Sequence, residues 1–354
     1  MGSVLHFRDK VPVVVLGATG SVGQRFIELL AKHPWFEIIS ISASERSVGK
    51  QYKNAVNWLM PTPLPQDIGD MVITPCQPGM PRALVFSALD SHVAGDIESQ
   101  FAQAGFLVVS NARNHRMQSD VPLLIPEINK DHLELLKLQS YMPGGIVTNP
   151  NCSTIGLALA LKPLHDRFGV AAVHIVTMQA ISGAGYPGVP SMDILDNVIP
   201  YINGEEHKIE TEPLKILGKL ENNHIEPASI NISAQCNRVP VSDGHMASVS
   251  IKLKTKASRS ELIEAWRGFT SEVYPMGLPL APQQPIHYFE QENYPQPKLH
   301  RNLEKGMAVS IGRLRECSIM DFKFSLLSHN TLRGAAGGAV LCGELLLKTG
   351  RIFW

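Results

Sequence analysis

The sequence predicts an α/β protein in two parts: a Rossmann-type domain with a parallel sheet, then an α+β domain with a mixed, largely antiparallel sheet. Three observations support this prediction. An apolar run, Val11–Leu16, leads into a glycine-rich turn. Strand and helix patterns then alternate as far as residue 150. Beyond that point, apolar and polar residues alternate singly, as in residues 247–254, which is the period of a sheet with one face in water.

The composition excludes several classes of protein. The chain has 354 residues, 44% hydrophobic and 18% charged, so it is long enough for two globular domains. Its 32 basic residues balance 32 acidic ones, so we expect no nucleic-acid partner and no attraction to a membrane surface. No run of about 18 apolar residues indicates a membrane span. Residues 1–10 also lack the apolar core of a signal peptide. We therefore expect a soluble protein with a small-molecule site.

The cysteines are five in number, widely scattered and without a C-x-x-C pair. This pattern argues against both a disulfide framework and a zinc site. It predicts a cytoplasmic location and no bound metal. The five are Cys76, Cys152, Cys236, Cys317 and Cys342.

The first glycine-rich turn predicts a dinucleotide site. Its spacing is G-x-x-G-x-x-G, and a helix-like segment follows it, until Pro34 ends the pattern. Glycines let the backbone turn tightly and approach a pyrophosphate, while the helix N-terminus faces the negative charge. The residues expected to contact the cofactor here are Gly17, Thr19, Gly20, Ser21, Val22 and Gly23.

The end of the second strand, expected at residues 37–41, indicates which cofactor binds. An NAD-specific site usually places a carboxylate there for a ribose hydroxyl. Here Ser44, Arg46 and Ser47 suit a 2′-phosphate instead, so NADP is favoured. Two alternatives stay open. Glu45 could reject that phosphate, and Arg46 with Lys50 could belong to a solvated loop.

The alternation continues with strand-like residues 83–87, a helix at about 92–104 and strand-like residues 106–110. The segment Ser-Asn-Ala-Arg-Asn-His-Arg at 110–116 then follows a strand's carboxyl end, where open α/β sheets bind ligands. Its arginines and asparagines are candidates for holding an anion. The alternative is a polar surface loop.

The most informative segment is Asn-Pro-Asn-Cys-Ser-Thr at 149–154. It follows strand-like residues 145–148 and precedes a helix-like run at 155–161, so Cys152 is expected at a helix N-terminus. Free N–H groups and the helix dipole stabilise a thiolate there, and the same N–H groups can hold an oxyanion. The alternative is a buried cysteine that only caps the helix.

The second half predicts strands at 170–179 and 321–326, with proline-rich loops or arms at 60–65 and 275–297. The last segment, residues 331–348, is apolar but carries Gly334, Gly337 and Gly338. Glycines weaken an isolated helix. We therefore expect this segment to pack closely against a flat partner, the first domain.

Polar residues near the predicted strand ends of the second half fit one chemistry. They are Gln179, Glu212, Lys215, Arg238 and His245. A thiolate that attacks an activated acyl group needs an acid/base partner, donors for the oxyanion and charges that fix a zwitterionic substrate.

With these motifs the chain resembles aspartate-semialdehyde dehydrogenases of the archaeal and fungal branch over essentially its full length. Seven separate motifs carry the resemblance, and their agreement by chance is implausible. They are Gly-Ala-Thr-Gly-Ser-Val-Gly (17–23), Ser-Asn-Ala-Arg-Asn-His-Arg (110–116), Asn-Pro-Asn-Cys-Ser-Thr (149–154), Gln-Ala-Ile-Ser-Gly-Ala-Gly (179–185), Glu-Thr-Glu-Pro-Leu-Lys-Ile-Leu-Gly (210–218), Asn-Arg-Val-Pro-Val-Ser-Asp-Gly-His (237–245) and His-Asn-Thr-Leu-Arg-Gly-Ala-Ala-Gly (329–337).

The resemblance implies NADPH-dependent reduction of L-aspartyl-4-phosphate to L-aspartate 4-semialdehyde through a cysteine thioester, on the way to threonine, methionine and in many organisms lysine. It also implies a role for each matching residue. Cys152 is the nucleophile, His245 the acid/base and Gln179 the group that orients the acyl intermediate. Arg238 binds the substrate's α-carboxylate, and Glu212 binds its amino group. Arg116 and Lys215 bind the phosphate, with Asn114 beside them. The nicotinamide lies near Asn330 and Thr331.

The expected division is an NADP-binding domain at 1–150, a catalytic and dimerisation domain at 151–329, and a C-terminal helix at 330–354 that returns to the first domain. The resemblance implies a homodimer or homotetramer. Two other functions stay open. A thioester reductase such as malonyl-CoA reductase would use the same cysteine and need no residue for an amino group. An NADP-sensing protein would keep the fold without the chemistry.

Overall fold

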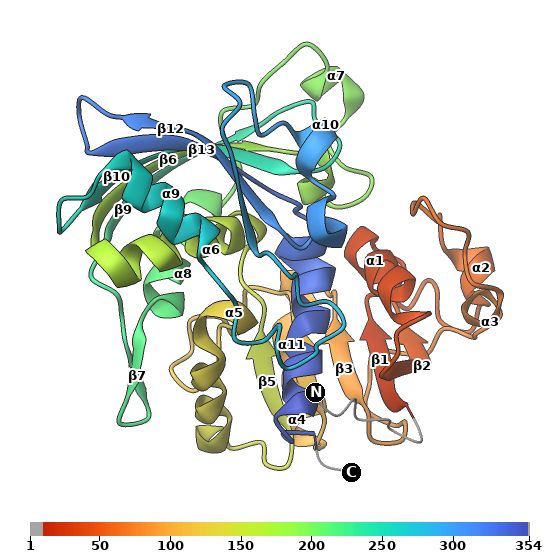
Figure 1. Ribbon diagram of the computed structural model, residues 1–354. Helices are drawn as coiled ribbons and strands as arrows, with labels where there is room; N and C mark the ends of the chain where they lie inside the picture. Colours follow the sequence, from red (N-terminus) through yellow and green to blue (C-terminus); the bar gives the residue numbers. More distant parts are fainter. Residues whose placement is uncertain (1–9, 353–354) are drawn as a thin grey trace.

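The computed structural model describes residues 10–352, which form two large sheets joined by helices, together with a two-stranded hairpin (Figure 1). Residues 1–9, where the sequence predicts no signal peptide, lie outside the described residues. The predicted outer domain limits at residues 1 and 354 also lie outside them. The first sheet has five parallel strands in the order β2-β1-β3-β4-β5. They are β1 (Val11–Leu16), β2 (Phe36–Ser42), β3 (Leu84–Ser87), β4 (Leu107–Ser110) and β5 (Gly145–Thr148).

Helices cover both faces of this sheet, because its strands are apolar on both sides. In β1, Val13 and Val15 belong to the core under α1 (Ser21–Leu30) and α11 (Gly337–Lys348). Val14 and Leu16 belong to the core under α4 (Ser91–Gln103) on the opposite face. This is the doubly wound arrangement that the sequence predicts, and its loops at the carboxyl ends of the strands form a ligand-binding edge.

The second sheet has six strands in the order β11-β12-β13-β10-β6-β9. Its central pairs are antiparallel, whereas β6 with β9 and β11 with β12 are parallel, so the sheet is mixed as predicted. The strands are β6 (Val170–Gln179), β9 (Asn231–Arg238), β10 (His245–Leu253), β11 (Ile286–Phe289), β12 (Val309–Glu316) and β13 (Phe322–Ser328). The stretch 275–297, predicted as a loop or arm, therefore contains one strand.

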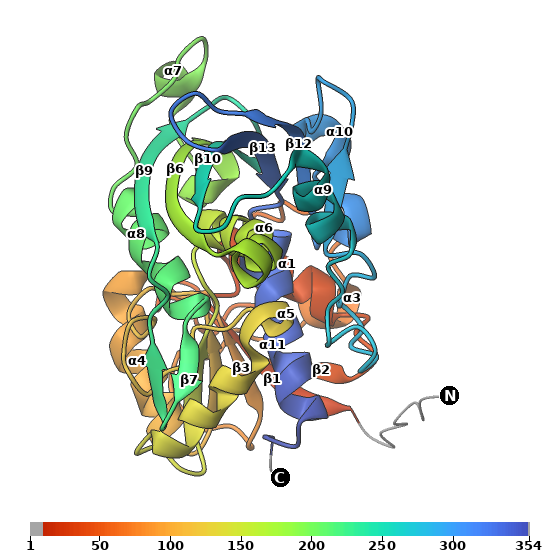
Figure 2. The same cartoon turned by 60° about the vertical axis from the view of Figure 1, so that its left-hand side comes forward.

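Helices α6 (Cys152–Phe168), α8 (Glu205–Ile216) and α9 (Arg259–Arg267) pack on one face of this sheet (Figure 2). The buried Trp266 ties α9 to α6, because its indole N–H donates to the Ala160 carbonyl at 2.9 Å. On the other face of β6, His174 is exposed and Val176 and Met178 are half-buried. The described residues place no helix layer over that face comparable to α6 and α9.

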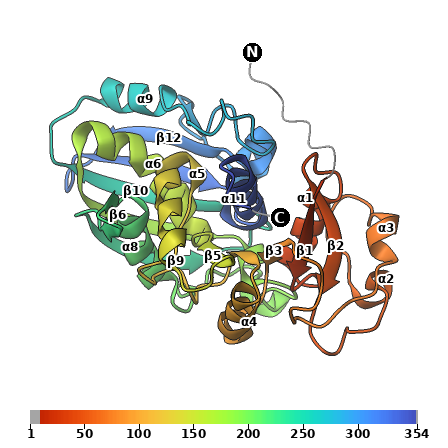
Figure 3. The same cartoon turned by 90° about the horizontal axis from the view of Figure 1, so that it is seen from below.

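The last segment, predicted as a single C-terminal helix at 330–354, is divided into two elements. A π-turn, η4 (Leu332–Ala336), precedes α11, which lies beside α1 and α5 (Pro126–Asn129) and against β3 and β4 (Figure 3). The first sheet uses residues 11–148 and the second residues 170–328, so the chain returns to its first sheet at the end.

The remaining elements are short, and none of the helices in residues 10–352 is long and apolar enough to cross a membrane. They are α2 (Tyr52–Ala55), α3 (Gln66–Gly69), η1 (Lys130–Leu138), η2 (Ile181–Ala184), α7 (Ser191–Ile194), β7 (Lys219–Glu221), β8 (His224–Glu226), α10 (Pro297–His300) and η3 (Leu303–Gly306).

We predict that Gly343→Ala destabilises the protein by roughly 1–3 kcal/mol, although alanine is the better helix former. A Cβ at Gly343 would lie 2.7 Å from Phe86 Cζ and 3.0 Å from Leu84 Cδ2, so α11 would have to move off β3. Urea unfolding measures the change. Gly79→Ala is the control, because a Cβ there would meet nothing within 4 Å. Equal stabilities for the two variants would contradict the close packing of α11.

Candidate active site

Two cavities meet between the sheets. The larger, about 910 Å³, follows the glycine turn and the carboxyl ends of the first sheet's strands. The smaller, about 360 Å³, reaches Cys152. Both are lined by Ser21, Val22, Ala184 and Gly185, so they form one continuous site. The five-stranded sheet contributes one wall, and the loop after β6 contributes the other.

The glycine turn is shaped for a close ligand. Gly17 has φ +73°, and a Cβ there would lie 2.6 Å from the Ala88 carbonyl oxygen. A Cβ at Gly23 would lie 2.2 Å from the Gly17 oxygen, so Gly23 serves the packing of helix on strand and does not line the cavity. Gly20 caps α1 without a side-chain bond, which leaves N–H groups of the first turn free for an anion. Of the predicted cofactor residues here, Gly17, Thr19, Gly20, Ser21 and Val22 line the larger cavity.

The turn after β2 lies at the far end of the same cavity. Ser44 and Glu45 line it. Arg46 is exposed and Ser47 is half-buried, and neither side chain lines the cavity. The end of this cavity therefore offers a hydroxyl and a carboxylate, with a guanidinium beside them in the same turn.

Cys152 is the first residue of α6, as predicted. The Asn151 side chain caps the helix by accepting from the N–H groups of Ser153 at 3.0 Å and Thr154 at 3.2 Å. The expected thiolate is not the resting form, however. Burial and then the Glu205 carboxylate raise the pKa of Cys152 to about 12. The positive charges of Arg116, Lys208 and Arg238 act in the opposite direction but are outweighed. The helix terminus alone does not offset the loss of water.

His245 begins β10 and is buried beside Arg238. Burial and then the Arg238 charge lower the pKa of His245 to about 3, so its ring is neutral near pH 7. The Ala180 N–H donates to His245 Nδ1 at 3.0 Å, so the proton of the neutral ring sits on Nε2. Within the described residues, Nε2 has no hydrogen-bond partner.

Gly183 separates this pair from the cavity. Gly183 lines the smaller cavity, whereas His245 and Arg238 do not. A Cβ at Gly183 would lie 2.8 Å from Arg238 Nη1 and 3.0 Å from His245 Nε2. Because this residue has no side chain, the imidazole and the guanidinium come up to the cavity wall.

Two predicted substrate residues, Glu212 and Lys215, do not line the cavity that reaches Cys152. Lys215 is buried, and its ammonium donates to the carbonyls of Arg116, Gln118 and Val121 at 2.6–2.8 Å. Glu212 accepts from Arg116 Nη1 at 2.8 Å and from the Asn151 N–H at 2.7 Å. Neither lines the cavity, because both are used in holding the loop and the helix cap in place.

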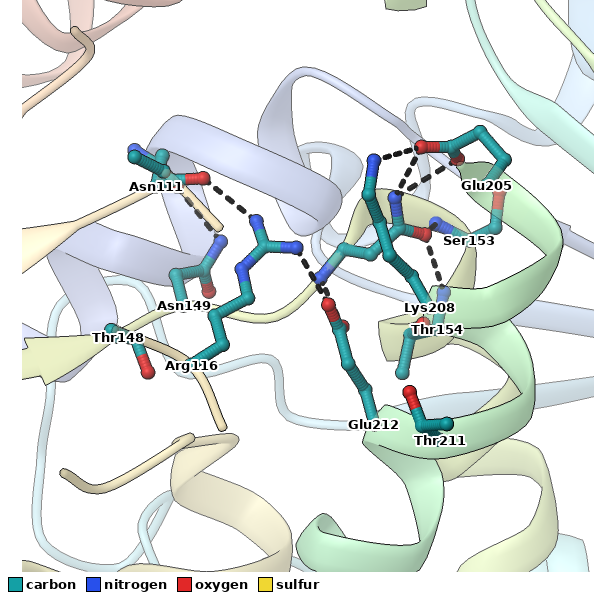
Figure 4. A network of polar contacts seen from close by, with 12 residues as sticks. Asn111, Arg116, Thr148, Asn149, Ser153, Thr154, Glu205, Lys208, Thr211 and Glu212 are labelled. Atoms are coloured by element: carbon teal, nitrogen blue, oxygen red, sulfur yellow. Dashed lines mark hydrogen bonds and ion pairs between the residues drawn. The ribbon is translucent and has the colours of Figure 1, made fainter. Parts of the chain in front are cut away.

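The sequence analysis did not single out Glu205 and Lys208, which line the cavity where Glu212 and Lys215 do not. They lie two helical turns earlier on the same face of α8, and both line the smaller cavity (Figure 4). Lys208 Nζ donates to Glu205 Oε1 at 2.7 Å, and Asn151 and Gln179 also donate to this carboxylate. Burial alone would raise the pKa of Glu205, but these partners keep it below its ordinary value.

The sequence contains the signal for this pair, although it is ambiguous. Glu-x-x-Lys occurs at 205–208 and again at 212–215. The two copies are seven residues apart and therefore share one helix face. Helical periodicity cannot separate them, because only the tertiary packing of α8 decides which copy lines the cavity.

Three of the four arginines and asparagines of the loop 110–116, all candidates for holding an anion, lie at the site. Asn111, Arg113 and Arg116 line the smaller cavity. Asn114, predicted to lie beside the phosphate, is exposed, does not line it, and donates to the Ser91 carbonyl at 2.9 Å. Arg116 is fixed by Glu212 and by the Asn111 carbonyl, which accepts from Nη2 at 2.7 Å (Figure 4).

Asn330 and Thr331 line the smaller cavity on the side of the loop after β6. Asn330 accepts from the Gly244 N–H and donates to Ser182 Oγ, both at 2.8 Å. Gln179 is buried and contacts Glu205. Within residues 10–352, no three His, Cys, Asp or Glu side chains form a group suited to a metal ion.

Two family models match the chain. The semialdehyde dehydrogenase NAD binding domain matches residues 12–136, and the semialdehyde dehydrogenase dimerisation domain matches residues 161–333. The aspartate-semialdehyde dehydrogenase of Archaeoglobus fulgidus is 48% identical over 340 residues, covering 95% of this chain and 98% of that protein. The Saccharomyces cerevisiae enzyme is 47% identical, covering 94% and 96%.

Solved structures agree with these matches. The Candida albicans aspartate-semialdehyde dehydrogenase, solved with NADP, has a TM-score of 0.90 at 44% identity, covering 97% of this chain and all of that one. Aspartate-semialdehyde dehydrogenase II of Vibrio cholerae, at 24% identity and a TM-score of 0.76, shares the fold.

We predict that Lys215→Met destabilises the protein by roughly 3 kcal/mol, because three buried carbonyls lose a charged donor. Lys208→Met, the same substitution two turns earlier, should cost about 1 kcal/mol or less, because its ion pair is partly exposed. Urea unfolding of both variants measures the difference. A Lys215→Met protein as stable as Lys208→Met would contradict the structural role of Lys215.

Proposed function

The chain belongs to the aspartate-semialdehyde dehydrogenase family, and we propose that it interconverts L-aspartyl-4-phosphate and L-aspartate 4-semialdehyde with NADP(H) and phosphate. One observation carries this proposal. The cavity that reaches Cys152 continues into the nucleotide cleft and is lined by charges of both signs, namely Arg113, Arg116, Lys208 and Glu205. An acyl phosphate that also bears a carboxylate and an ammonium group complements those charges.

NADP(H) fits the larger cavity. The free N–H groups at the start of α1 suit its pyrophosphate, and the left-handed backbone of Gly17, packed against Ala88, makes the tight turn that leads into them. Ser44, Arg46 and Ser47 are proposed to hold the 2′-phosphate, and Asn330 and Thr331 to lie near the nicotinamide. When bound, this cofactor supplies or accepts a hydride. The solved relative from Candida albicans contains NADP.

The first chemical step is acyl transfer to Cys152. The Sγ–C bond forms, the C–O bond to phosphate breaks, and the thiol proton leaves with hydrogen phosphate. Because burial raises the pKa of Cys152, the thiol is the resting form, and charge develops on sulfur only during the attack. Arg116 and Lys208, which line the same cavity as Cys152, would stabilise that charge and hold the departing phosphate.

The second step reduces the thioester. His245 presents a protonated Nε2 without a partner, so it would donate a hydrogen bond to the carbonyl oxygen and stabilise the negative charge that this oxygen gains when hydride reaches the carbon. The oxyanion then re-forms the carbonyl, the C–S bond breaks, the aldehyde leaves, and the sulfur takes a proton from water to restore the thiol. In the oxidative direction the thiol loses that proton as it attacks the aldehyde, and the same N–H holds the oxyanion. The neutral ring supports this donor role, whereas the predicted role as an acid requires a ring protonated at both nitrogens.

The charged side chains are proposed to orient the substrate. Arg238 would pair with the α-carboxylate and Glu205 with the amino group, in place of Glu212. Arg116 with Lys208, in place of Lys215, would hold the phosphate. Gln179, which contacts Glu205, would orient the acyl group.

A homodimer or homotetramer in the cytoplasm completes the proposal. The matched dimerisation domain and the half-buried apolar residues on the outer face of β6 support self-association. All five cysteines are free thiols, which suits a reducing compartment.

We predict that the purified protein reduces NADP with L-aspartate 4-semialdehyde only when phosphate is present. Cys152→Ala should lose turnover by roughly 10⁴-fold or more, because no covalent acyl intermediate can form. Its NADP affinity, measured by fluorescence titration, should be unchanged, since Cys152 does not line the larger cavity.

Other outcomes of this assay would redirect the proposal. Reduction of malonyl-CoA with NADPH, without semialdehyde activity, would indicate a thioester reductase. NADP binding with no turnover of either substrate would indicate a sensor protein.

We also predict that Arg46→Glu weakens NADP binding by roughly 1.5–3 kcal/mol and leaves NAD binding nearly unchanged, because a charge-assisted hydrogen bond to the 2′-phosphate is lost. Lys50→Glu, the same charge change in the same exposed turn, is the control. Binding titrations with both cofactors measure the effect. Equal losses for NADP and NAD would assign Arg46 to a solvated loop.

A further inference from the structure

The π-turn η4 lies against Cys152. It packs beside the start of α6, and Gly334, Ala335 and Cys152 line the same cavity. A Cβ at Gly334 would lie 2.6 Å from Cys152 Cβ and 2.9 Å from its Cα. The turn's backbone is therefore the surface that limits where the thiol can point. π-turns are rare in proteins and are found often at functional sites.

The same turn touches other parts of the site. The Ala335 carbonyl accepts from Asn149 Nδ2 at 3.3 Å, just before the helix cap of α6. Asn330, which precedes the turn, bonds both the Gly244 N–H next to His245 and the Ser182 hydroxyl next to Gly183. A shift of the turn would therefore move three parts of the site together: Cys152, the backbone at Gly244 before His245, and the loop at Ser182 that covers His245.

A buried ion pair anchors the turn on its other side. Arg333 is 1% exposed, and its guanidinium makes two parallel bonds to Glu127 on α5, Nη1 to Oε1 at 2.5 Å and Nη2 to Oε2 at 2.8 Å. Two bonds between planar groups fix direction as well as distance. Neither Arg333 nor Glu127 lines the cavity that reaches Cys152.

We propose that Arg333 and Glu127 are positioning residues for Cys152: their ion pair sets the depth of the π-turn and so the orientation of the thiol in the cavity. The proposal rests on the proposed function only for the role of Cys152. In some proteins a buried ion pair selects one conformation even where it adds little stability. Here the selected conformation is the one in which Gly334 closes the wall beside the cysteine.

The test is the double variant Arg333→Met with Glu127→Met, which removes both charges and leaves no unpaired one buried. Three quantities are measured: the thermal midpoint, kcat with KM, and the rate at which iodoacetamide alkylates the peptide carrying Cys152 as a function of pH. We expect kcat to fall about 10- to 100-fold, because small displacements of a nucleophile have effects of that size. KM should change little, since Arg238, Glu205 and Lys208 are not on the turn.

The alkylation profile separates positioning from general stability. The charged groups whose fields act on Cys152 are Glu205, Arg116, Lys208 and Arg238, and none is altered in the variant. If the turn moves away, water reaches the sulfur, and the midpoint of alkylation should shift to lower pH. A variant with a lower thermal midpoint but an unchanged kcat and an unchanged alkylation profile would overturn the proposal.

Two further variants keep the test decisive if the double variant does not fold. Gly334→Ala leaves the ion pair intact and pushes directly on Cys152, so it should alter kcat and the alkylation profile; wild-type behaviour would overturn the proposal. Arg351→Met with Glu134→Met removes another Arg–Glu pair, near the end of α11, and should alter neither. Alkylation needs no substrate. If the wild-type protein had no semialdehyde activity, the proposed function would be wrong. The alkylation measurements would still test whether the ion pair positions Cys152.

Discussion

The hydrogen bonding of Asn151 is the constraint on which the candidate site depends. Its side-chain oxygen caps α6, its side-chain amide donates to Glu205, and its backbone N–H donates to Glu212. Glu205 and Glu212 both lie on α8, but they bond to different groups beyond it. Glu205 leads to Lys208 and the cavity, and Glu212 leads to Arg116 and the first sheet. One helix cap therefore joins both halves of the chain at the residue before the cysteine.

Burial around this cap changes the chemistry that the sequence suggests. A cysteine at a helix N-terminus is expected to be a thiolate, but loss of water and the Glu205 carboxylate outweigh the helix dipole. The same burial keeps His245 neutral. The resting site thus holds a thiol and an imidazole, both uncharged, among fixed cations and the Glu205 carboxylate. Negative charge develops on the reacting sulfur and oxygen only when substrate is bound, and the cations can then stabilise it.

Much of the fold could be predicted because its signals are local. The bounds of β1, β5 and β6 match the prediction, and so does the alternation of β10 and β13. The π-turn and β11 were missed. Glycine content alone does not distinguish a π-turn from an α-helix. The many prolines at 275–297 indicated a loop, although this stretch contains the short edge strand β11. The positions of Cys152 and of the glycine turn could be predicted because each stands where a strand ends and a helix begins.

The charged residues of the site could be predicted only in part. Arg116 lies in the cavity because its loop follows β4, a position that the strand pattern already gives. The sequence analysis named Glu212 and Lys215, whereas Glu205 and Lys208 line the cavity. Which of the two Glu-x-x-Lys copies faces the cavity depends on how α8 packs between the two sheets, and no local pattern encodes that packing. The π-turn also bears on how the protein is made. One wall of the site comes from the segment after Asn330, whereas the cysteine it contacts is at position 152. During synthesis the nucleotide fold and the nucleophile emerge first, and the reactive pocket stays unfinished until residues 332–336 have also been translated. A nascent chain that still lacks those residues would therefore expose its cysteine without the wall that orients it.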